Sequence, residues 1–118
     1  MKKFFVFLLC FVCFLGCEAK HNSSVNYVEA KEKIINESAI LVDVRTEEEY
    51  NEGHIDGAIL LPLDSINQDS VKDVVDDYSK VIIVYCRSGQ RSAQALEKLT
   101  ELGYKEVYDL GAMSNWRE

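Results

Sequence analysis

The sequence predicts an α/β domain whose sheet is mostly parallel and is covered by helices on both faces. Short apolar runs alternate along the chain with stretches of helical periodicity, and strands that are separated by helices usually pair in parallel. The runs are almost wholly apolar, which is typical of strands buried on both faces. A chain of 118 residues suits one domain with a single core.

The first half of this domain contains two helices and two strands in alternation. Ala30 and Ile34 share one face of the first helix, and apolar residues fill the strand that follows it. Thr46 and Glu49 form a capping box, which predicts the start of a helix. The elements expected here are a helix over 27–36, a strand over 40–44, a short helix from Thr46 that Gly53 stops, and an apolar run over 58–63 that ends around Pro62.

The second half repeats the alternation. The run 81–85 is the most hydrophobic of the expected strands, and we expect it to lie at the centre of the sheet. The elements expected here are a helix capped by Asp69 or Ser70 and reaching Tyr78, the strand 81–85, a helix over 92–102 that Gly103 ends, a strand over 106–110, and a terminal turn of helix within 112–118.

Cys86 ends the central apolar run and opens a polar loop before a helix. Ligands of open α/β sheets bind outside the carboxyl ends of the strands. A thiol is nucleophilic only as its thiolate, and backbone N–H groups, a helix N-terminus and guanidinium groups all favour that anion. Arg87 and Arg91 flank Gly89 in this loop and would also attract an anionic substrate. We therefore predict a reactive thiol, against the alternative of a small buried hydrophobe.

The N-terminal segment has the pattern of an export signal. Lys2 and Lys3 precede an almost wholly apolar run over 4–15, which is too short to span a bilayer but fits a secretory signal. Its end, Phe14-Leu15-Gly16-Cys17, resembles a bacterial lipoprotein signal, in which the cysteine is lipidated and becomes the new N-terminus. An ordinary cleaved signal and a short uncleaved anchor are the alternatives. The expected organisation is a signal peptide over 1–16, a lipidated N-terminus and tether over 17–26, and a single domain over 27–118.

Export would leave one free thiol in the mature chain. Cys10 and Cys13 would leave with the signal, and Cys17 would carry lipid such as palmitate. Cys86 then has no partner for an internal disulfide, and an unpaired cysteine in an oxidising compartment is a liability unless the thiol is used. The cysteine count therefore points to Cys86 independently of its loop.

The charge of the mature chain limits its partners. Removing Lys2 and Lys3 reduces the 13 basic residues to 11 against 20 acidic ones, so the net charge is about −9. Such a charge argues against nucleic acid and against electrostatic binding to anionic lipid, so we expect membrane attachment through the lipid anchor only. The expected protein is a monomer on the periplasmic or outer face of a bacterial cell envelope.

Three segments resemble the rhodanese family of sulfurtransferases, and together they cover roughly 25–118. They are Leu41-Val42-Asp43-Val44-Arg45 with Glu48-Glu49-Tyr50 and Gly53-His54-Ile55-Asp56-Gly57-Ala58, then Tyr85-Cys86-Arg87-Ser88-Gly89-Gln90-Arg91-Ser92, and then Gly103-Tyr104 with Asp109-Leu110-Gly111 and Trp116. Ala112 departs from the family, in which a second glycine is common at this position. The resemblance implies a rhodanese-like three-layer domain with a central, mostly parallel five-stranded sheet.

The resemblance also implies a reaction. Cys86 would take the sulfane sulfur of thiosulfate, or of a related persulfide or polysulfide, and would pass it as a persulfide to a thiol or to cyanide. The amides of the loop, from Arg87 through Ser88, Gly89 and Gln90 to Arg91, would cradle the persulfide, and the two guanidinium groups would attract the anionic donor. No metal or organic cofactor is implied.

Two other functions remain open at this point. A rhodanese-like module without catalysis could bind a partner or carry sulfur, although such a module has no need of a thiolate site. A cysteine phosphatase or arsenate reductase is less favoured, because such phosphatases need five residues between the cysteine and the arginine that clamps phosphate. Four residues separate Cys86 from Arg91, and Ser92 occupies the position that the longer loop would give to arginine.

The remaining charged residues are expected to have structural roles. Asp43 and Arg45 follow a buried strand, in a segment that the family uses to brace the sheet and loop. We expect Asp43 to be partly buried and hydrogen-bonded. Arg45 could instead project towards the rim of the site, and both residues are candidates for supporting the site from behind. Glu47, Glu48 and Glu49 are expected to be a solvated first helical turn.

Overall fold

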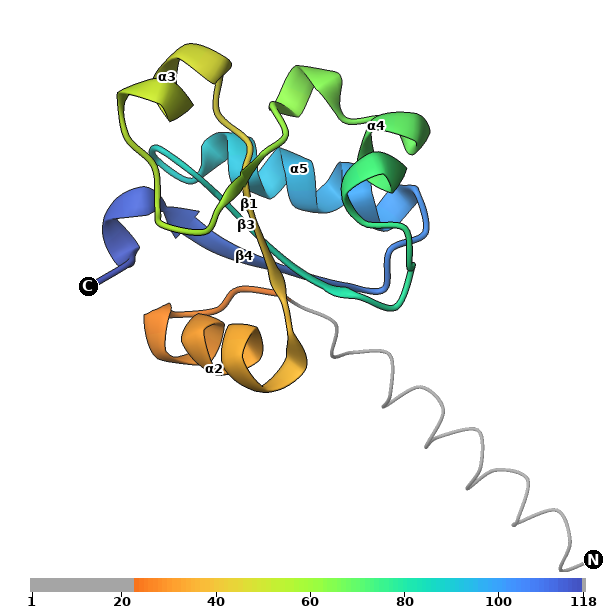
Figure 1. Cartoon of the computed structure of the whole chain (residues 1–118), viewed down its shortest axis with the longest axis horizontal. Helices are drawn as coiled ribbons and strands as arrows, with labels where there is room; N and C mark the ends of the chain where they lie inside the picture. The colour runs from red at the N-terminus through yellow and green to blue at the C-terminus, as the bar shows by residue number, and fades with distance from the viewer. Residues whose placement is uncertain (1–22, 118) are drawn as a thin grey trace, which may run out of the picture.

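The computed structural model describes residues 23–117 and confirms the predicted α/β class (Figure 1). Helices and strands alternate along the chain, as the apolar runs indicated. The elements are α2 (Tyr27–Glu37), β1 (Ile40–Asp43), α3 (Glu47–Glu52), β2 (Ile59–Leu60), the 3-10 turn η1 (Leu63–Ser65), α4 (Gln68–Val74), β3 (Val81–Cys86), α5 (Gln90–Glu101), β4 (Glu106–Ala112) and the 3-10 turn η2 (Met113–Asn115).

The strands form one parallel sheet in the order β2-β1-β3-β4, with β3 inside the sheet as expected. The prediction of five strands is wrong: the described part of the chain has four. A further segment does approach β4, but only Ser24 forms a bridge, with Asp109, before Asn26 caps α2. The segment is therefore too short to count as a strand. The backbone hydrogen bonds that Asp109 makes with Ser23 and Val25 also show that 23–26, expected to be tether, belong to the folded unit.

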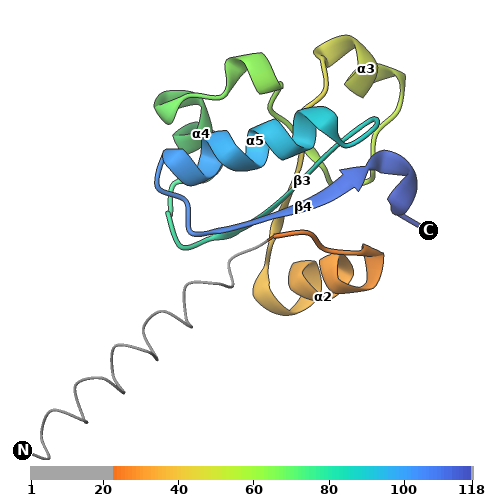
Figure 2. The ribbon, with the colours of Figure 1, turned by 180° about the vertical axis from the view of Figure 1, so that it is seen from behind.

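Helices cover both faces of the sheet, as predicted. Figures 1 and 2 show α2 on one face and α4 and α5 on the other. Successive side chains of a strand point to opposite faces. Along β3, Ile83 and Tyr85 accordingly belong to the core that includes Ala30 of α2, whereas Val84 and Cys86 belong to the core on the α4 and α5 side. Cys86 and Tyr85 therefore face opposite sides of the sheet.

Several element boundaries differ from the predictions. Asn67, and not Asp69 or Ser70, caps α4, because its side chain accepts from the Ser70 amide while the Ser70 hydroxyl accepts from the Asn67 amide. The helix α4 ends at Val74, before Tyr78, and α5 begins at Gln90, two residues before the expected start. The strand β4 continues to Ala112, so that only a short 3-10 turn follows it.

The predicted signal peptide and Cys17 lie outside the described residues. Within 23–117, no helix has both the length and the apolar character needed to cross a membrane.

Candidate active site

The candidate site lies where two neighbouring parallel strands end. Because β1 and β3 are paired in parallel, the segments that follow them leave the same edge of the sheet. The segment after β1 leads into α3, and the segment after β3 leads into α5. Cys86 at the end of β3 and Glu49 on α3 are thereby brought to the same edge.

The sulfur of Cys86 lies at the N-terminus of α5. The residue is fully buried, and its Sγ accepts hydrogen bonds from the backbone amides of Gly89 at 3.0 Å and Ser92 at 3.3 Å. Gly89 is the N-cap residue of α5 and offers no side chain as a cap. Its φ of +101° is in the left-handed region that favours glycine. The Cys86 sulfur therefore satisfies helix amides that a capping side chain would otherwise bind.

These contacts favour the thiolate. Burial raises the pKa of the Cys86 thiol and is the largest single influence, but hydrogen bonds from Ser92, Gly89 and Ser88 outweigh it and leave the pKa below its ordinary value. Three of those donors are backbone amides, and the fourth is the Ser92 hydroxyl. That hydroxyl also lies 3.1 Å from the Gly89 carbonyl oxygen, so its one hydrogen can serve either acceptor. The negative sulfur at a helix N-terminus is further favoured by the helix dipole.

The two arginines of the loop differ in their surroundings. The Arg91 guanidinium donates two hydrogen bonds to the Glu49 carboxylate, from Nη1 to Oε1 at 2.8 Å and from Nη2 to Oε2 at 3.0 Å. The Arg87 side chain is 76% exposed, and its Nη1 lies 4.0 Å from Glu49 Oε2. The side chains of Ser88 and Gln90 are exposed on the same loop. The structure therefore brings the predicted loop residues together, with one arginine held by an acid and one largely open to solvent.

Glu49 is a site residue that the sequence analysis missed. It was expected to be solvated, but its side chain is only 20% exposed because it contacts Arg91. The same carboxylate closes the capping box with Thr46. Hydrogen bonding to Arg91 is the main cause that lowers the pKa of Glu49 to about 2, so the group is ionised at neutral pH. The capping box with Thr46 could be recognised in the sequence, because its two residues are three positions apart. The contact with Arg91 could not, because Arg91 lies 42 residues away.

Asp43 and Arg45 form a buried ion pair behind the site. Arg45 Nη2 lies 2.7 Å from Asp43 Oδ2 and also 2.7 Å from the Gly53 carbonyl oxygen, and Arg45 is 6% exposed. The Tyr85 hydroxyl donates to Asp43 Oδ2 at 2.6 Å. The burial and bonding expected for Asp43 are present. Of the two positions left open for Arg45, the structure has the bracing one and not the rim, because Asp43 and Gly53 hold its guanidinium inside.

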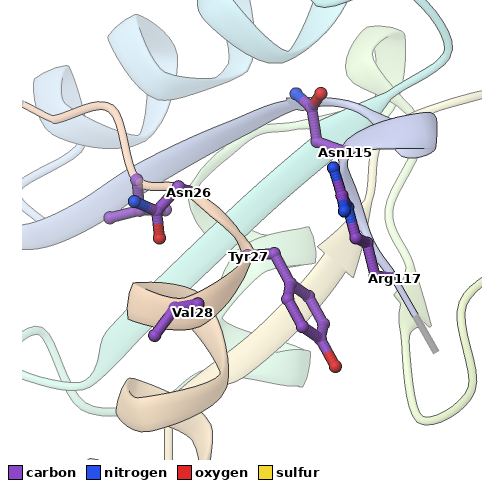
Figure 3. Close-up of a pocket in the computed structure, with 6 residues that line it drawn as sticks. Asn26, Tyr27, Val28, Asn115 and Arg117 are labelled. Atoms are coloured by element: carbon purple, nitrogen blue, oxygen red, sulfur yellow. The ribbon is translucent and has the colours of Figure 1, made fainter.

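Two further features bear on what else the fold could bind. Within 23–117, no group of three or more His, Cys, Asp or Glu side chains is arranged to hold a metal ion. A hollow of about 430 Å³ lies between the start of α2 and the chain around η2. Figure 3 shows Tyr27 and Arg117 among the side chains that line it. It is lined by Val25, Asn26, Tyr27, Val28, Asn115 and Arg117. Cys86 does not line this hollow, which is therefore separate from the candidate site.

The chain is similar to known proteins over most of its described part. Residues 26–118 match the model of the rhodanese-like domain. The thiosulfate sulfurtransferase PspE of Escherichia coli is 36% identical over 74 residues, covering 63% of this chain and 70% of that protein. The thiosulfate sulfurtransferase GlpE of Coxiella burnetii is 33% identical over 94 residues, covering 79% of this chain and 85% of that protein.

A solved structure described as a rhodanese with anions from E. coli has the same fold. Its TM-score is 0.62 at 35% sequence identity, and the match covers 65% of this chain and 89% of that one. The prediction of an enzyme of the rhodanese type is confirmed at the level of these homologues. The chain belongs to the rhodanese-like domain family.

Proposed function

We propose that the protein transfers a sulfane sulfur from thiosulfate, or from a related persulfide or polysulfide, to a thiophilic acceptor such as a thiol or cyanide. The observation that carries the proposal is the position of the Cys86 sulfur, which accepts hydrogen bonds from the amides of Gly89 and Ser92 at the N-terminus of α5. That position favours a thiolate, the form in which a cysteine is a nucleophile. The names of the sulfurtransferase relatives support the same reaction class.

The transfer has two steps. The Cys86 thiolate attacks the outer sulfur of thiosulfate, a sulfur–sulfur bond forms to Cys86, and the bond to the sulfonate sulfur breaks. Sulfite departs with the electron pair and Cys86 becomes a persulfide anion. A thiolate or cyanide then attacks the outer sulfur of the persulfide, takes it as a new persulfide or as thiocyanate, and returns Cys86 as thiolate. Because the enzyme holds the sulfur between two substrates, ping-pong kinetics are expected.

The loop geometry favours this reaction over phosphate chemistry. A phosphatase would need an arginine directed at the phosphate bound above the thiolate. Arg91, the arginine placed after Gly89, instead gives two hydrogen bonds to Glu49. The exposed Arg87 is the cation of this loop that is more open to an incoming anion.

The test uses the chain without its first 22 residues, so that Cys86 is the sole cysteine. After incubation with thiosulfate and removal of the excess, intact mass should show one added sulfur atom, which cyanide should remove as thiocyanate. Cys86→Ser should show no added sulfur and no turnover, because its hydroxyl is not ionised at neutral pH. A wild-type protein that gains no sulfur from thiosulfate or from an organic persulfide would instead be a binding module.

We propose further that the protein is exported and anchored by lipid at Cys17. The basic start, the apolar run over 4–15 and Gly16-Cys17 support this proposal. The full chain expressed in a bacterium should fractionate with membranes and gain the mass of acyl chains. Cys17→Ser should be released or remain as precursor. A soluble, unlipidated wild-type protein would contradict the proposal.

A further inference from the structure

Glu49 lies against both arginines of the Cys86 loop. Its two carboxylate oxygens each accept from one nitrogen of the Arg91 guanidinium, at 2.8 and 3.0 Å. The same carboxylate is 4.0 Å from Arg87. A bidentate pair of this kind fixes both the position and the orientation of the guanidinium. The arginine that follows Gly89 is thus already occupied by an anion from this chain.

This pair reduces the positive charge that the loop offers to a donor. Apart from the Cys86 thiolate, two guanidinium groups and one carboxylate leave a net charge of about +1, which is carried mainly at the exposed Arg87. The side chains of Arg91 and Glu49 are 33% and 20% exposed, so both remain near the solvent from which a donor arrives. An anionic donor therefore meets attraction from Arg87 and repulsion from Glu49. Both energies are proportional to the charge of the donor, so the penalty from Glu49 is twice as large for a dianion as for a monoanion.

We infer that Glu49 is a specificity-determining residue, which disfavours dianionic sulfur donors relative to monoanionic ones by keeping Arg91 neutralised. The inference rests on the proposed sulfurtransferase function and adds a preferred substrate class to it. Monoanionic donors include organic persulfides and thiosulfonates, whereas thiosulfate is a dianion. Glu49 acts through Arg91 and through its own charge.

Two donors that differ by one charge test the inference. Thiosulfate gives a Cys86 persulfide and sulfite. Methanethiosulfonate gives the same persulfide and methanesulfinate, by the same attack on the outer sulfur and with breakage of the equivalent sulfur–sulfur bond. Because Coulomb energy is proportional to donor charge, removing the Glu49 charge should change the logarithm of kcat/KM twice as much for the dianion as for the monoanion.

The variant is Glu49→Gln. Glutamine can replace glutamate in a capping box, so the contact with Thr46 and the start of α3 should be retained. For a charge about 6 Å from the donor in water, we expect kcat/KM to rise about threefold with methanethiosulfonate and about tenfold with thiosulfate. The gain should appear mainly in KM and should shrink in high salt.

Glu48→Gln is the matched control, because Glu48 is exposed on the same helical turn and has no ion pair with any residue of 23–117. It removes the same charge, and it should change the ratio of the kcat/KM values for thiosulfate and methanethiosulfonate much less. If Glu49→Gln changed kcat/KM by the same factor with both donors, whether as a gain or as a loss, Glu49 would only hold the loop. That result would overturn the inference while the proposed function stands. A wild-type chain that forms no Cys86 persulfide with either donor would overturn both.

Discussion

The Tyr85 hydroxyl donates a 2.6 Å hydrogen bond to Asp43 Oδ2 and accepts one from the Ile55 amide at 3.1 Å. Tyr85 precedes Cys86 in the chain, but its side chain points into the opposite face of the sheet. The residue beside the candidate nucleophile thus connects β3 to the end of β1 and to the segment before β2. This contact supports the strand that carries Cys86 without touching the sulfur.

Tyr85→Phe should lower stability without changing the thiol. The variant leaves the buried Ile55 amide without its acceptor, so we expect a loss of about 1–3 kcal/mol in the free energy of unfolding. Urea unfolding measures the loss, and the rate of Cys86 alkylation against pH should not change. Tyr27→Phe is the control, because the Tyr27 hydroxyl makes no hydrogen bond within the described residues. Equal effects of the two variants would contradict the role given to Tyr85.

Asp43 and Arg45 should behave as a coupled buried pair. Asp43→Asn leaves the buried Arg45 guanidinium without its carboxylate, and we expect a loss of about 3–5 kcal/mol. Arg45→Met should also be costly, because it leaves Asp43 buried with Tyr85 and the Arg45 amide as its remaining donors. The double variant should lose less than the two single losses together, which a double-mutant cycle in urea measures. Strictly additive losses would show that the pair contributes no interaction of its own.

The parts of the site that the sequence predicted are local ones. The capping box of Thr46 and Glu49, and the place of Cys86 between a strand and a helix, depend on residues a few positions apart. The contact of Glu49 with Arg91 depends on the register that sets β1 beside β3, so nothing near Glu49 in the sequence shows it. The charge of the site could therefore not be worked out before the fold.

The number of strands shows the same difference between what local sequence predicts and what only the fold decides. Each of the four strands was predicted from its own apolar run. The fifth strand came from the family resemblance, and here the chain reaches Asn26 after a single bridge at Ser24. The orientation of Arg45 stayed open for a related reason, since only the packed structure brings the Gly53 carbonyl oxygen within reach of its guanidinium.

Ser92 should set the pKa of the thiol. Ser92→Ala removes the hydroxyl that helps to lower the pKa of Cys86, so the pKa should rise towards its ordinary value. The alkylation rate with iodoacetamide, measured against pH, should then reach half its maximum at higher pH than in the wild type. Ser88 contributes through its backbone amide, so Ser88→Ala should leave the profile in place. A shift in Ser88→Ala as large as that in Ser92→Ala would contradict this account.

The lowered pKa of Cys86 should make the free energy of unfolding depend on pH. The pKa of Cys86 is lowered in the folded chain, so between that pKa and the unfolded value of about 8.5 the unfolded chain binds more protons. Unfolding free energy should therefore rise with pH through this window, and the contribution should be lost as pH falls below the folded pKa. Cys86→Ala should lack the rise, as urea unfolding at several pH values would show. A free energy of unfolding that falls with rising pH through this window in the wild type would contradict the lowered pKa of Cys86.

Gly89→Ala should impair both the fold and the thiol. A Cβ at this position would meet only ordinary contacts, the nearest at 3.8 Å from Gly111, so the cost is the strain of the left-handed backbone, about 1–2 kcal/mol. Relief of that strain would move the Gly89 amide from the Cys86 sulfur and raise the pKa of the thiol. Gly57→Ala is a matched control, because Gly57 also has a positive φ, +88°, and nothing lies within 4 Å of a Cβ added there. The two variants should lose similar stability, and only Gly89→Ala should shift the alkylation profile upward and slow sulfur uptake from thiosulfate. If Gly57→Ala slowed uptake equally, general loss of stability would explain the effect, and the Gly89 amide would have no role of its own.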